Sequence, residues 1–161
     1  MLIEITSYAI PTVTRFVADF LGFGDQIRTQ LDQQDRKYSE NQIYQHFTNC
    51  QDYLTYNSDE TIAWKLRMAY RDSMKFLKRM TEQGVRDAQP GLFKFFERSY
   101  GTKDDNDQVK ELRKFGTMVA RALVKEKRMT TEEAAGIMLA TALDATHKSI
   151  LTVSTSILSV L

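Results

Sequence analysis

The residues whose types and spacing could support chemistry gather near the end of the chain. Asp144 and His147 stand in a largely apolar stretch that runs from Ala134 to Leu161. A helix would place both on one face, about one turn apart, where a carboxylate and an imidazole can handle a proton. These two are the candidate catalytic residues.

Small residues surround this pair and would let a planar molecule approach the helix backbone. Three of them are the candidate cofactor contacts: Thr141, Ala142 and Ala145. Two interpretations remain open. In the first, the Asp144–His147 pair faces a flat cofactor or a lipid substrate. In the second, the two side chains form an internal hydrogen bond or reach the rim of a buried helix.

The chain has two histidines and one cysteine as further candidates for metal or nucleophilic chemistry. His46 and Cys50 have helical i,i+4 spacing, which could bring the imidazole near the thiol and lower its pKa. No oxyanion-hole motif accompanies them, so an inert helix cysteine is the simpler interpretation. The sequence has no HExxH, CxxC, GxSxG, P-loop or GxGxxG pattern, so a dedicated metal, hydrolase or nucleotide site has no support. Either histidine could be an axial haem ligand, against the simpler alternative of a partly buried or surface imidazole.

The elements that position these residues are predicted to be helices. Only two prolines and seven glycines interrupt the chain, and no hairpin dipeptide separates alternating apolar runs. The predicted fold class is all-α, with five or six helices around a long apolar C-terminal helix. The predicted segments are a first helix ending at Gly22 and Gly24, a polar loop over 25–37, helices over 39–56, 57–84 and 107–128, a short helix or turn over 89–101, and a last helix after Thr130.

Capping patterns fix several of these boundaries. The expected N-terminal caps are Ser39 with Gln42, Asn57 or Ser58, and Thr130 with Glu133. Gly84 is the expected C-terminal stop of the helix that starts near Asn57.

Length and charge limit the class of protein. The 161 residues are 42% hydrophobic and 27% charged, typical of a single globular domain. The net charge of +1 suggests neither nucleic acid nor an acidic membrane surface as a partner. Basic residues gather at Lys75–Arg79 and Lys110–Arg128, where nearby acidic residues favour solvated helix faces. One cysteine and the lack of a signal peptide predict a cytoplasmic protein.

The C-terminal stretch is long enough to raise the question of a transmembrane helix. The polar group Asp144, His147 and Lys148 argues against lipid exposure, so we expect a buried core helix instead. Because this helix is apolar nearly all round, residues 1–161 are expected to be one all-α domain or a fragment of a larger one. A missing domain or a second copy of the chain would pack on it.

Three stretches carry a resemblance to a known family. They are EITSYAIPTVTRFVADFLGF (4–23), YSENQIYQHFTNCQDYLTYNSDETIAWKLRMAYRDSMKFLKRM (38–80) and TTEEAAGIMLATALDATHKSILTVSTSIL (130–158). In order and pattern they resemble the cytochrome P-450-like hydroperoxide isomerase domain of fungal fatty-acid dioxygenases, the linoleate diol synthases or psi-factor-producing oxygenases. The N-x-D-x-x-x-A-W-K-L-R stretch at Asn57–Arg67 and the polar break in the last helix carry most of the likeness, which is loose between 85 and 107.

The resemblance implies a partial haem-thiolate oxidoreductase domain that takes a fatty-acid or lipid hydroperoxide and uses haem as its cofactor. It places the last helix across the distal face of the haem. Asp144 and His147 would stand where the family carries an Asn and a Gln that assist O–O cleavage. Thr141, Ala142 and Ala145 would give clearance to haem or substrate.

The chain also departs from the family pattern. Asp144 and His147 replace two amides, and Cys50 lacks the F-x-x-G surroundings of the thiolate loop. Without that loop, we expect the chain to be inactive alone. The alternative is a non-enzymatic helical interaction or oligomerisation module. A third interpretation is a small helical haem or lipid binder that uses His46 or His147 directly.

Overall fold

The computed structural model describes residues 12–28, 37–89 and 107–158, and most of these are helical. The helices comprise residues 12–20, α2 (Glu40–Tyr56), α3 (Ala63–Ala88), α4 (Asp107–Lys125) and α5 (Thr131–Leu158). The all-α prediction is confirmed. Within the described ranges, no helix combines the length and the apolar character needed to cross a bilayer.

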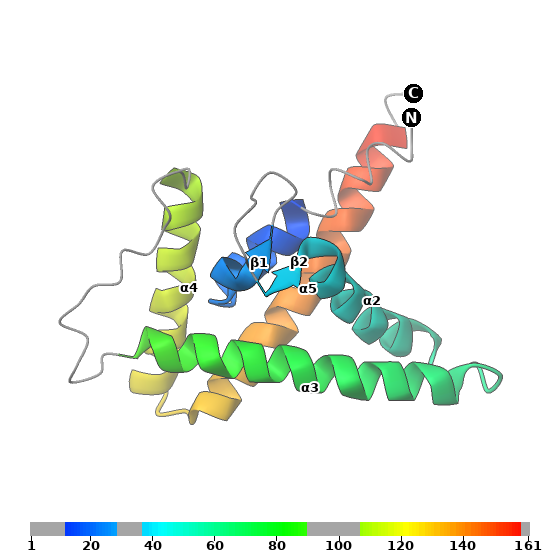
Figure 1. The fold of residues 1–161 in the computed structure, drawn as a ribbon, viewed down its shortest axis with the longest axis horizontal. Helices are drawn as coiled ribbons and strands as arrows, with labels where there is room; N and C mark the ends of the chain where they lie inside the picture. Colours follow the sequence, from blue (N-terminus) through cyan, green and yellow to red (C-terminus); the bar gives the residue numbers. More distant parts are fainter. Residues whose placement is uncertain (1–11, 29–36, 90–106, 159–161) are drawn as a thin grey trace.

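Helix α3 is the base of the arrangement and packs against α2, α4 and α5. Figure 1 shows α2 folding back along the first half of α3, while α4 stands at the other end of α3. Helix α5 crosses α3 obliquely and continues past the start of α2. The helix over 12–20, drawn in blue, lies among these elements. Its buried side chains join those of α2, α3 and α5 in one core that includes Leu21, Phe47, Leu77 and Leu139.

Two predicted capping boxes set the starts of α2 and α5. The Ser39 hydroxyl accepts from the Gln42 amide at 3.2 Å, and the Gln42 side chain accepts from the Ser39 amide at 2.8 Å. Thr130 and Glu133 exchange the same pair of bonds, at 3.2 and 2.8 Å. Both boxes satisfy amides that the first turn of a helix leaves without partners, so both predictions are confirmed.

The predicted bounds of α3 are wrong at both ends. The helix begins at Ala63, and its N-cap is Ile62, which makes no side-chain capping bond. Residues 57–62 form turns in which the Asp59 carboxylate accepts from the Thr61 amide at 3.0 Å. At the other end, α3 continues through Gly84 to Ala88.

Gly84 lies inside α3 because another backbone crosses the helix there. A Cβ at Gly84 would collide with the Leu21 carbonyl oxygen, and one at Gly116 in α4 would collide with that of Phe20. Gly22, the predicted stop of the first helix, has a φ of 83° and follows directly. The backbone from Phe20 to Gly22 therefore packs directly against α3 at Gly84 and against α4 at Gly116, where the glycines leave room for it.

The polar loop predicted over 25–37 contains regular structure in its first residues, and a short strand follows it. Residues Gly24–Gln26 form a short 3₁₀ helix, and Ile27–Arg28 (β1) pairs in parallel with Tyr38–Ser39 (β2). Ile27 is fully buried, which explains why this end of the segment folds inward. The strand pair was missed because two residues per strand give no alternating pattern to recognise.

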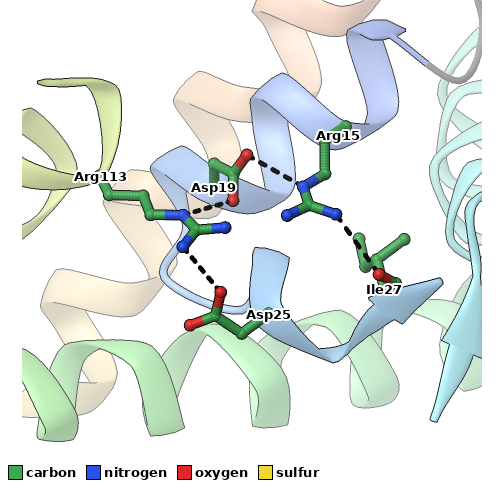
Figure 2. Close-up of polar contacts among 5 residues, drawn as sticks. All are labelled: Arg15, Asp19, Asp25, Ile27 and Arg113. Atoms are coloured by element: carbon green, nitrogen blue, oxygen red, sulfur yellow. Dashed lines mark hydrogen bonds and ion pairs between the residues drawn. The ribbon is translucent and has the colours of Figure 1, made fainter. Parts of the chain in front are cut away.

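A buried ion network joins the first helix to α4, as Figure 2 shows. The Asp19 carboxylate receives Arg113 Nε at 2.9 Å and Arg15 Nε at 3.1 Å, while Arg113 Nη1 lies 2.7 Å from Asp25. Arg15 also donates to the Ile27 carbonyl at 3.4 Å. Burial raises the pKa of the Asp19 carboxyl, and attraction to the two guanidinium groups opposes that rise.

Candidate functional site

Helix α5 carries all five candidate residues identified from the sequence, and it is buried on one side only over 131–146. The side facing the molecule is formed by Ala134, Ala135, Met138, Leu139, Ala142, Leu143 and Thr146. The opposite side is exposed and consists of Gly136, Ile137, Ala140, Thr141, Asp144 and Ala145. Over 131–146 the described part of the chain covers one side of α5 and leaves the other side open.

The structure separates the candidate cofactor contacts. Thr141 and Ala145 share the exposed side with Asp144, at the i,i+4 spacing of one helix face. Ala142 is only 2% exposed and points into the core, so it cannot meet a ligand on that side. Asp144 is exposed, so its charge does not lie in the apolar core.

His147 continues the same helix, but its side chain lies outside the described residues. The backbone is helical from Asp144 through His147, as predicted. The described part of the site is thus Asp144 with its small neighbours on the exposed side.

Two threonines show how α5 presents a smooth surface. The Thr141 hydroxyl donates to the Ile137 carbonyl at 3.0 Å, and the buried Thr146 hydroxyl donates to the Ala142 carbonyl at 2.7 Å. Each hydroxyl is satisfied by the preceding turn of its own helix. The exposed side has short side chains at Ala140, Thr141 and Ala145, with the larger Ile137 one turn before Thr141.

Gln51 contacts α5 from α2, and the sequence did not identify it as a candidate. Its side-chain amide donates to the Leu143 carbonyl at 3.0 Å and so fixes α5 to α2. The two residues are 92 positions apart, and no local pattern signals such a bond. The bond is made to the residue that precedes Asp144 and helps to fix the position of that turn.

The His46–Cys50 spacing does not produce an activated thiol. Cys50 is fully buried, and burial raises its pKa to about 12. His46 instead places Nδ1 3.1 Å from the Ser73 hydroxyl and stacks on Phe76 with ring centroids 4.2 Å apart. Cys50 is an inert core residue, as the simpler interpretation held.

These contacts also bear on iron ligation. His46 is engaged by Ser73 and Phe76, and Cys50 would have to ionise in an apolar core before it could bind a metal. Across the described part of the chain, no three His, Cys, Asp or Glu side chains gather at a distance suited to a metal ion. The described residues can cover one face of a flat group, but neither His46 nor Cys50 is placed to hold its metal.

Comparisons with protein-family models, with curated proteins and with solved structures give no match for this chain.

Proposed function

We propose that this chain is part of a haem-thiolate domain related to fatty-acid hydroperoxide isomerases, and that the exposed side of α5 forms the wall above the haem. The observation that carries the proposal is the position of Asp144 among Ala140, Thr141 and Ala145 on an open helix face. Short side chains there would allow a planar macrocycle to reach the helix surface. The sequence resemblance supplies the identity of that macrocycle.

The surroundings of this face support its role as a rigid wall. The buried side of α5 packs against the core, and Gln51 fixes the turn that bears Asp144. A carboxylate on a rigid helix would keep its position relative to a bound ligand, as a group that transfers protons must. Haem, when bound, would supply the chemistry of O–O bond cleavage. This chain would supply the wall, the Asp144 carboxylate and the His147 imidazole that the resemblance assigns.

The proposal requires an iron ligand from outside residues 1–161, because Cys50 is the single cysteine and its thiol is buried and protonated. We therefore expect no turnover of a fatty-acid hydroperoxide by this chain alone, and any haem that it binds would be held by contact with the open face of α5. Turnover would depend on a partner that adds the thiolate.

A haemin titration followed in the Soret region tests the proposal. We expect saturable one-to-one binding that Ala145→Trp abolishes, because an indole would block the open face. Gln83→Trp, which places the same indole at an exposed position of α3, is the control and should keep binding. Binding that is absent, or equal in both variants, would contradict the proposal. Binding lost only in His147→Ala would point instead to a histidine-ligated small haem protein.

The second candidate is a helical interaction or oligomerisation module, and one observation favours it. Phe115 and Met118 on α4 are 57% and 58% exposed, and Phe16 in the first helix is 57% exposed. The ring of Phe115 also lies 6.1 Å from that of Phe20. Sedimentation equilibrium would decide between the candidates: a stable oligomer that Phe115→Asp dissociates, with no haemin binding, would favour this second function.

A further inference from the structure

A separate apolar surface lies where α2 and α3 meet. Its members are Leu54, Tyr56, Ile62, Trp64 and Met68, with exposed fractions of 61%, 53%, 37%, 63% and 48%. Figure 1 shows that this end of the α2–α3 pair projects from the body, away from α4. Large apolar side chains gathered at a projecting point usually mark an interaction site.

A row of cations continues from this apolar end along α3. Trp64, Met68, Arg71, Lys75 and Arg79 follow one exposed helical stripe, and Lys65 and Arg67 lie beside it. The five cations make no ion pair with any residue that the structure describes. Lys65 instead lies over the Trp64 ring, 5.7 Å from its centroid. We call the five apolar residues and these five cations the hairpin surface.

We propose that the hairpin surface binds peripherally to a membrane that contains anionic phospholipids. Trp and Tyr favour the boundary between water and acyl chains, and cations favour the headgroups of anionic lipids. The stripe from Trp64 to Arg79 spans about 22 Å along a single helix, so its members can meet one plane together.

The form of the surface favours a lipid occupant over a folded protein. The apolar residues come from the end of α2, the turn after it and the start of α3, and Figure 1 shows that this end of the pair projects from the body. A fluid bilayer accepts such a shape, whereas a protein partner would need a matching groove. Three nearby carboxylates would repel an anionic lipid: Asp59, Glu60 and Asp72. The Asp59 carboxylate already accepts a hydrogen bond from the Thr61 hydroxyl. The five cations outnumber these carboxylates.

The overall charge of the chain conceals this arrangement. A net charge of +1 averages the cations of α3 with acidic residues elsewhere, which is why the sequence suggested no acidic membrane surface as a partner. The distribution of the charges matters more than their sum, because exposed charges interact over about one Debye length, roughly 10 Å at 0.1 M ionic strength.

Vesicle sedimentation tests the proposal, with phosphatidylcholine vesicles that either contain or lack phosphatidylserine. Trp64 is the single tryptophan, so its fluorescence should shift to shorter wavelength on binding. Binding should require phosphatidylserine and weaken with added salt. Arg71→Gln with Lys75→Gln should lower the affinity by about fivefold for each cation removed. Trp64→Ala should also weaken sedimentation.

Matched variants on other surfaces complete the experiment. Lys125→Gln with Lys127→Gln removes the same charge from an exposed part of the chain, and Phe115→Ala removes an exposed ring from α4. Both should bind vesicles as the unchanged protein does. The proposal is overturned if neither vesicle binds, or if the control pair weakens binding as much as the α3 pair. Binding of soluble polyglutamate without binding of vesicles would also overturn it and would indicate an acidic protein partner.

Discussion

The imidazole of His46 lies between the Ser73 hydroxyl and the ring of Phe76. Asn49 donates its side-chain amide to the same hydroxyl at 3.0 Å, which leaves the hydroxyl hydrogen free to point at His46 Nδ1. This arrangement suits a neutral ring that carries its proton on Nε2. Burial also lowers the pKa of His46 from its ordinary value of 6.5.

The lowered pKa of His46 gives a pH dependence with a definite sign. As the pH falls through 6.5, the unfolded chain takes up a proton at this residue, whereas the folded chain does so only at lower pH. The free energy of unfolding should therefore fall as the pH drops below 6.5. Urea titrations at a series of pH values, on the unchanged protein and on His46→Gln, measure this. Equal slopes with pH in the two proteins would show that His46 does not contribute.

Residue types alone were a poor guide to the surroundings of single side chains. His46 and Cys50 do have helical i,i+4 spacing. That spacing does not reveal that the imidazole contacts two residues of another helix, Phe76 and Ser73 in α3. Asp144 shows the same limit. In a segment where nearly every residue is apolar, periodicity cannot say which side faces water.

At the scale of the elements, two glycines decide how closely the helices approach. Gly84→Ala and Gly116→Ala each place a methyl group against a backbone carbonyl, of Leu21 and Phe20 respectively. Because a backbone cannot yield as a side chain can, we expect each change to lower the free energy of unfolding by about 1–3 kcal/mol. Chemical denaturation of the purified variants measures the loss.

Gly136 is the matched control for these changes. It lies in α5 with no atom within 4 Å of where a Cβ would be. Gly136→Ala should raise the free energy of unfolding by up to about 1 kcal/mol through helix propensity alone. A loss of stability there, or no loss in the other two variants, would be inconsistent with the packing described.

The elements themselves were predictable wherever the signal was local. Capping boxes at Ser39 and Thr130 place two helix starts correctly, because a cap depends on residues within one turn. Gly84 was mistaken for a helix end because the reason for that glycine is a backbone from a different part of the chain. The parallel pair of β1 and β2 was missed for a related reason, since Ile27 is recruited by tertiary burial.

For the whole molecule, the network around Asp19 is the main polar link between the first helix and α4. Asp19→Ala would leave Arg113, only 6% exposed, without the carboxylate at 2.9 Å from its Nε. Removing one member of a buried pair costs about 3–5 kcal/mol, and we expect a loss of that order. Thermal and urea unfolding both measure it.

The exposed pair between Lys78 and Glu132 provides the comparison for that prediction. Glu132→Ala removes an ion pair between α3 and α5 whose two side chains are 42% and 68% exposed. Solvent already screens this pair, so stability should hardly change. Similar effects of Asp19→Ala and Glu132→Ala would show that burial of the Asp19 network contributes little.

The bond between Arg113 and Asp19 also bears on the order in which the chain assembles. Its two residues are 94 positions apart, whereas α2 and α3 are joined by a short turn. Closing a long loop costs more entropy than closing a short one, so the α2–α3 pair should form early and the docking of α4 on the first helix should come late. Interactions formed after the rate-limiting step mainly control how fast a protein comes apart. The Asp19 network would then control the unfolding rate of the chain rather than its folding rate.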